Sequence, residues 1–158
     1  MKVYNRLNAV RYAKQYALSP NPRFYHFKDL GGDCTNFISQ CLLAGGCAMI
    51  YDKAKGWFYN SISDRSYSWT GVAFLQQFLL SPTVGGPKAK ICNLQDLEVG
   101  DIIQLRQNDT HFNHTLFISN IVKDEIYVCA HSDDSLDRKL STYSYKQLLP
   151  LHIICADC

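Results

Sequence analysis

The thiol of Cys34 is the side chain in this sequence best placed to do chemistry. It follows Gly31, Gly32 and Asp33, and residues 34–44 have the apolar spacing of a helix. Asp33 is expected to cap that helix by accepting backbone hydrogen bonds, which puts the thiol in the first turn. There the free amide groups and the helix dipole favour the thiolate, the form in which cysteine is a nucleophile. The alternative is a small buried cysteine with a packing role.

A cysteine nucleophile needs a base, and His114 is the best placed histidine. It opens the apolar run 115–118, which is typical of a strand. If this strand packs on the helix that carries Cys34, the imidazole faces the thiol and can accept its proton. The alternative is a structural histidine whose ring nitrogens have hydrogen-bond partners in the core.

The third member of such a site is open between two residues. His131 ends the next predicted strand, where its ring would lie at the same sheet edge and orient His114. Asp133 follows two residues later and is the alternative orienting group. His111 in a polar turn and His152 far along the chain are interpreted as surface or packing residues.

The spacing of apolar residues predicts helices first and strands afterwards. This order indicates an α+β domain in which N-terminal helices pack on a C-terminal antiparallel sheet. Phe37 and Cys41 are expected in the core between them. The predicted helices are residues 4–18, 34–44 and 71–80, the predicted strands are 102–105, 114–122, 125–130 and 152–156, and residues 81–90 are predicted as a loop.

An aromatic stretch at residues 49–69 has no clear helix or strand period. Its two tryptophans, Trp57 and Trp69, are candidate walls of a substrate groove, together with Tyr59. Packing of the aromatic rings beneath a long loop is the alternative interpretation.

Composition limits the classes of function. The chain has 158 residues, a size typical of one domain, and we expect residues 1–158 to form a single domain. Hydrophobic residues make up 47% and aromatic residues 13%, which indicates a packed chain and not a disordered one. The net charge is +2 without a cluster of Lys and Arg, which argues against a nucleic-acid or anionic-membrane partner. No apolar run has the roughly 18 residues of a membrane helix.

The cysteines do not have the spacing of a metal site. Their odd number and scatter predict reduced thiols, no bound metal and no cofactor. The pair at positions 155 and 158 lacks the second pair that four zinc ligands require. The seven cysteines are Cys34, Cys41, Cys47, Cys92, Cys129, Cys155 and Cys158.

Two stretches together carry a family resemblance. The first is Tyr4, Asn5, Arg6, Ala9, Val10, Tyr12 and Ala13; the second is the run from Gly31 to Gly46. With them the sequence resembles the bacterial putative amidase domain family, which belongs with the NlpC-type and CHAP-type peptidases of the papain-like group. The Gly100–Asp101 turn, the His114 strand and the segment 131–133 also match, so the resemblance covers nearly the whole chain.

The resemblance implies a papain-like fold and a cysteine hydrolase that cleaves amide bonds through an acyl thioester. The usual substrate class is bacterial cell-wall peptidoglycan, cut as an amidase or an endopeptidase. It implies Cys34 as nucleophile and His114 as base. Tyr25 is similar in placement to a tyrosine of NlpC-type enzymes, and its hydroxyl would help the Cys34 amide to hold the oxyanion, with Asp33 beside it on the substrate side.

Two other functions stay open. One is a catalytically silent module that uses Trp57 and Trp69 to hold wall peptide or glycan. The other is a transglutaminase-like or deamidating acyl transferase, because the same thiol and imidazole can pass the acyl group to an amine. Residues 1–6 lack the apolar core of a signal peptide. We therefore expect a cytoplasmic chain, or one that reaches the cell wall after lysis or as part of a larger exported protein.

Overall fold

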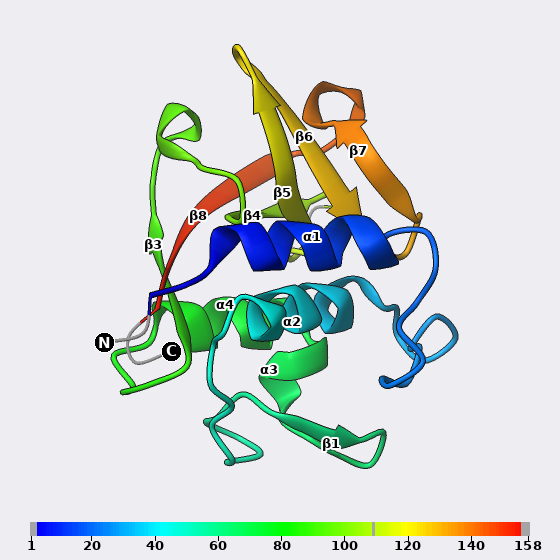
Figure 1. Ribbon diagram of the computed structural model, residues 1–158, viewed down its shortest axis with the longest axis vertical. Helices are drawn as coiled ribbons and strands as arrows, with labels where there is room; N and C mark the ends of the chain where they lie inside the picture. The colour runs from blue at the N-terminus through cyan, green and yellow to red at the C-terminus, as the bar shows by residue number, and fades with distance from the viewer. Residues whose placement is uncertain (1–2, 109, 156–158) are drawn as a thin grey trace.

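A computed structural model describes residues 3–108 and 110–155 of the chain (Figure 1). Helices precede the main sheet, as predicted for an α+β protein. α1 and α2 have 11 residues each, and no helix in the described part of the chain has the length and apolar character to cross a membrane. The helices are α1 (Arg6–Tyr16), α2 (Cys34–Ala44), α3 (Tyr67–Thr70) and α4 (Val72–Leu80), with short 3-10 turns η1 (Leu94–Asp96) and η2 (Leu140–Thr142).

Six antiparallel strands form the main sheet in the order β3-β8-β4-β5-β6-β7. Two further strands, β1 (Tyr59–Ser61) and β2 (Asp64–Arg65), pair with each other apart from it. The predicted antiparallel sheet is therefore confirmed. Its strands are β3 (Pro87–Ile91), β4 (Ile102–Arg106), β5 (His114–Val122), β6 (Glu125–Ala130), β7 (Ser135–Lys139) and β8 (Gln147–Cys155).

The two faces of the sheet carry separate cores because strand side chains alternate between faces. Ile102 and Phe117 point into the larger core, where they meet the helices, including Phe37 of α2. Ile103 and Leu116, their neighbours along β4 and β5, belong to the second core on the other face. Figure 1 shows α1 crossing in front of the strands with α2 beside it. The predicted core positions Phe37 and Cys41 are both wholly buried.

A buried carboxylate ties the start of α1 to the sheet. Asp101 accepts hydrogen bonds from Nη1 of Arg6 at 2.7 Å and from the backbone N–H of Ile153 at 2.8 Å. Nδ1 of His152 lies 2.9 Å from its second oxygen. His152, interpreted from the sequence as a surface or packing residue, is thus a partly exposed partner of this carboxylate.

Several predicted elements have the expected bounds, and others differ. α2, β5 and β6 begin and end where the sequence predicts, whereas α1 and α4 are shorter than predicted. β3 begins inside the predicted loop 81–90 and ends one residue beyond it. Pro87 and two neighbouring glycines disfavour a strand assignment there, but an edge strand tolerates the proline. β8 begins five residues before the predicted strand 152–156. Residue 156, the last residue of the predicted strand, lies outside the described residues. The side chains of the Cys155 and Cys158 pair are also not described.

Candidate active site

Cys34 and His114 line one cavity of about 500 Å³. Cys34 is the first residue of α2 and His114 the first residue of β5, so two elements far apart in sequence bring the thiol and the imidazole to one hollow. The rest of the lining is mostly polar: Gly31, Gly32, Gln107, Asn113, Ser132, Asp133, Arg138, Thr142, Tyr143 and Ser144.

The thiol of Cys34 is held against β5. Its Sγ lies 3.7 Å from Oγ1 of Thr35, and it accepts a hydrogen bond from the backbone N–H of Thr115. Oγ1 of Thr35 lies in turn 3.2 Å from Oγ1 of Thr115. The first turn of α2 is thus fixed to the residue that follows His114.

Burial, not the helix terminus, dominates the acidity of the thiol. Cys34 is 8% exposed. Desolvation raises its pKa above the ordinary value, and the hydrogen bonds from Thr115 and Thr35 offset this only in part. Burial thus opposes the thiolate that the start of the helix was expected to favour.

His114 is a neutral imidazole at neutral pH. Burial lowers its pKa to about 4; the charge of Asp133 raises this pKa and that of Arg138 lowers it. A neutral ring can accept a proton, which is what a general base must do. Among the described residues no hydrogen bond joins the ring to the thiol. Thr115 points toward α2, and His114 and Cys34 are related by the cavity that both line.

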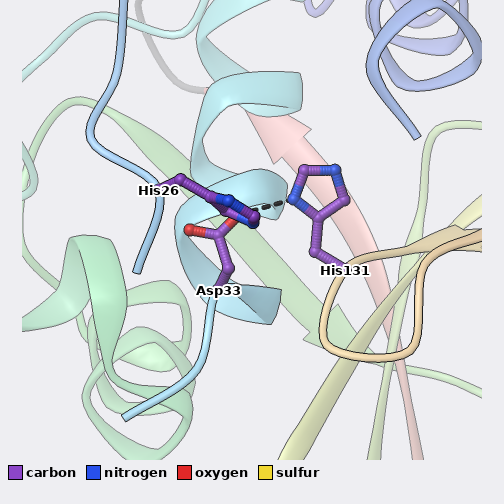
Figure 2. A group of neighbouring side chains, drawn as sticks. All are labelled: His26, Asp33 and His131. Carbon is purple, nitrogen blue, oxygen red and sulfur yellow. Dashed lines mark hydrogen bonds and ion pairs between the residues drawn. The ribbon is translucent and has the colours of Figure 1, made fainter. Parts of the chain in front are cut away.

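The structure does not bring His131 to His114. Nδ1 of His131 lies 2.5 Å from Oδ2 of Asp33, and Nε2 lies 2.7 Å from the carbonyl oxygen of Tyr16 (Figure 2). The ring also stacks on Phe37 at 4.1 Å between centroids. Both ring nitrogens are engaged, so the assignment of His131 as the group that orients His114 is corrected. β6 was predicted, but not the direction in which the side chain of His131, the residue after it, points.

Asp133 is the acidic residue at the cavity. It shares the cavity lining with His114, and its Oδ2 accepts a hydrogen bond from Nη1 of Arg138 at 3.0 Å. Its side chain is 77% exposed, so it acts on His114 through charge and makes no hydrogen bond to the ring among the described contacts. Of the two predicted orienting groups, only Asp133 lies at the cavity.

The predicted substrate-side residues lie elsewhere. Trp57 and Trp69 have no exposed surface and donate their indole N–H groups to Ser39 and Asn36. They are core residues, and the groove assignment is corrected. Tyr25 is 41% exposed and is not among the residues that line the cavity, so its oxyanion role stays a prediction without a supporting contact.

Asp33 has a different role from the one predicted. Its carboxylate does not cap α2. Instead Oδ1 accepts hydrogen bonds from the backbone N–H of Phe27 at 2.7 Å and from Nδ2 of Asn36 at 2.8 Å, while Oδ2 faces His131. Asp33 is 1% exposed and does not line the cavity, so its placement on the substrate side is also corrected: it is a buried hub behind the thiol.

Ser132 and Arg138 line the cavity but have no role in the site predicted from the sequence. Ser132 lies in the turn after β6, and its Oγ accepts a hydrogen bond from the backbone N–H of Asp33 at 2.8 Å. Arg138 on β7 donates to Thr142 and Asp133, and its guanidinium lies 3.7 Å from the ring centroid of Tyr143. Ser132 adjoins the matched histidine and was within reach of sequence reasoning. Nothing in the sequence pointed to Arg138, because β7 was not predicted.

Comparisons with known proteins give one matching family and two relatives. A family model described as a putative amidase domain matches residues 3–154. Two relatives come from Bacillus subtilis (strain 168): uncharacterized protein YhbB, 33% identical over 146 residues, covering 90% of this chain and 45% of that protein, and uncharacterized protein YjcM, 31% identical over 147 residues, covering 87% and 33%. The chain thus spans less than half the length of these two relatives. No solved structure matches.

We expect Asp33→Ala to lower the free energy of unfolding by about 3–5 kcal/mol, because it leaves the His131 ring and two buried donors without their acceptor. Urea denaturation followed by circular dichroism, with EDTA present, measures the loss. Asp29→Ala is the matched control, since Asp29 is an exposed residue of the same loop. Equal stability of the two variants would contradict the role of Asp33 as a hub.

We expect burial of neutral His114 to make the protein less stable in acid. Its folded pKa of about 4 lies below the unfolded value of about 6.5. The stability is therefore intact above pH 6.5 and is lost as the pH falls toward 4, by about 2–3 kcal/mol at pH 4.5. His114→Gln should remove this part of the pH dependence in urea denaturation at pH 7 and 4.5. His111→Gln, at an exposed histidine, should not; an unchanged pH dependence in His114→Gln would refute a buried neutral ring.

Proposed function

Because the chain belongs to the putative amidase domain family, we propose that it hydrolyses an amide bond with Cys34 as nucleophile and His114 as general base. The observation that carries this proposal is the shared cavity, which a buried thiol and a neutral imidazole both line. A helix that starts at the cysteine and a sheet strand that starts at the histidine are also the elements that a papain-like, NlpC-type site would require.

The resting pair is neutral, so the proton moves during attack. His114 takes the proton of Sγ while the sulfur bonds to the substrate carbonyl carbon, and a tetrahedral oxyanion forms. When the C–N bond breaks, the imidazolium returns the proton to the leaving nitrogen and an amine departs. Water then gives a proton to His114 and its oxygen attacks the thioester; the C–S bond breaks, and the thiol is restored with a carboxylic acid product.

We propose two donors for the oxyanion. The first is the backbone N–H of Cys34, which has no partner within the helix because it lies in the first turn of α2. The second is the hydroxyl of Ser132. Its oxygen already accepts the N–H of Asp33, one residue before the thiol, and its proton remains free to point into the cavity that Ser132 and Cys34 both line.

The cavity favours a polar, peptide-like substrate. Arg138 is held by Asp133, by two oxygens of Thr142 and by the ring of Tyr143, which leaves further N–H groups of its guanidinium for a substrate carboxylate or carbonyl. Asp133 offers a negative charge beside it. Stem peptides of bacterial peptidoglycan carry both kinds of charge, and we propose them as the substrate class, cleaved by an amidase or endopeptidase reaction.

Cys34→Ala should abolish release of new amino groups from purified peptidoglycan while the protein stays folded, because the nucleophile is lost. His114→Ala should lower kcat by at least about 100-fold, the scale of general-base catalysis. Mass spectrometry of the products measures both and identifies the bond. Cys92→Ala, at a half-buried cysteine away from the cavity, is the control.

Hydrolysis by Cys34→Ala would refute the proposal. A product that carries an added amine would show an acyl transferase that uses the same residues. If the native protein cleaves nothing, and it and Cys34→Ala bind wall fragments equally well, the domain is a binding module.

Ser132→Ala should lower kcat by about 100-fold or more, as loss of one oxyanion donor does in other enzymes. KM should change little, because the donor acts on charge that develops in the transition state. Ser144→Ala is the matched control: Ser144 also lines the cavity, but its carbonyl and not its hydroxyl is the group that accepts a hydrogen bond, from Gln107. Equal rates for the two variants would remove Ser132 from the mechanism.

A further inference from the structure

Behind the candidate active site, three ligand-type side chains converge on one point. Nδ1 of His131 and Nε2 of His26 lie 2.5 and 3.6 Å from the same oxygen, Oδ2 of Asp33. Figure 2 shows the His26 ring next to the carboxylate and the His131 ring facing it. The three ligand atoms all lie within 4.8 Å of one another.

The hydrogen bonds of His131 leave a lone pair facing a carboxylate. Its Nε2 lies 2.7 Å from the carbonyl oxygen of Tyr16, which can only accept, so Nε2 carries a proton. In the neutral ring, Nδ1 is then an acceptor that faces Oδ2 of Asp33, a second acceptor. Two acceptors at this separation need a positive charge between them, which is either a proton or a metal ion.

The surroundings are those of a metal ligand set. The N–H of His131 to a backbone carbonyl is the outer contact that metal-bound histidines commonly make. Oδ1 of Asp33 is held by Phe27 and Asn36, which fixes the carboxylate and leaves Oδ2 for an ion. His131 and Asp33 are almost fully buried, whereas the side chain of His26 is 32% exposed.

A second cavity supplies access. It measures about 310 Å³ and is lined by His26, Lys28, Asp33, Ser132, Asp133 and Asp134. Water from this cavity can fill a fourth position beside His26. Lys28 is the one positive lining side chain, and it is exposed, so it can turn to solvent; two further carboxylates balance its charge.

We propose that His26, Asp33 and His131 bind a divalent transition-metal ion, with Zn²⁺ the best match to two imidazoles and one carboxylate. Zinc bonds of about 2.0–2.1 Å in a tetrahedron hold ligand atoms roughly 3.3 Å apart. The His26 to Asp33 distance is already close to this, and the His131 contact lengthens when the ion replaces the proton. The site is separate from the thiol and does not depend on the proposed hydrolysis.

The test is a zinc titration of the full, EDTA-stripped chain at pH 7.5, in competition with a chromophoric chelator and without substrate. We expect one Zn²⁺ per chain and a rise in Tm with zinc. His26→Ala removes one ligand but leaves the buried pair intact, so the variant should fold, bind zinc at least tenfold more weakly and lose the rise in Tm.

The controls locate the ion. His111→Ala removes an exposed histidine elsewhere, Cys34→Ala removes the cavity thiol, and the double variant Cys155→Ser/Cys158→Ser removes the thiols at the chain end; each should bind zinc like the native protein. Absence of zinc binding, or binding that His26→Ala leaves unchanged, would overturn the proposal and leave a proton between Asp33 and His131. Loss of binding in Cys34→Ala would overturn it by moving the ion to the catalytic cavity.

Discussion

The contact between Asp33 and His131 is the interaction on which the site depends. It joins four segments: the end of α1 through the carbonyl of Tyr16, the loop at Phe27, the start of α2, and the turn after β6. The thiol of Cys34 is the next residue after this junction, so its position follows from it. A charged or strongly polar pair in the interior is costly unless every remaining donor and acceptor is satisfied, and here the surrounding backbone groups satisfy them.

The same constraint explains why the helix of the nucleophile is polar yet buried. All residues of α2 from Cys34 to Leu42 are buried, so its polar side chains need partners within the protein. Asn36 accepts from Trp69, Ser39 donates to the backbone of Trp69, and Oε1 of Gln40 accepts from Tyr12. The two indole N–H groups thus donate hydrogen bonds to polar side chains of α2. Both tryptophans are buried in this role and are not part of a substrate surface.

Sequence reasoning succeeded where periodicity is strong and failed where direction matters. α2, β5 and β6 have clear apolar spacing and were predicted to their ends. Pro87 and its neighbouring glycines disfavour a strand, so β3 was not predicted. Because β7 was not predicted either, Arg138 could not be placed at the cavity. His131 lies one residue beyond the end of β6, next to the predicted position, but sequence does not show toward which neighbour such a side chain turns. Burial of Trp57 and Trp69, and the desolvation that raises the pKa of Cys34, are tertiary effects that no local pattern carries.

Cys34 and His114 are both buried. The start of α2 therefore does not have the expected role of stabilising a resting thiolate. Desolvation raises the pKa of the thiol and lowers that of the imidazole, so both changes oppose a resting thiolate and imidazolium. In the resting state the free amides at the start of α2 therefore face a neutral thiol and not a thiolate. In the proposed reaction, their favourable interaction with an anion is realised only when the oxyanion and the imidazolium form together. An interaction that is absent in the resting state and present in the transition state lowers the barrier itself, so a neutral buried pair at a helix start suits acyl transfer better than a preformed ion pair would.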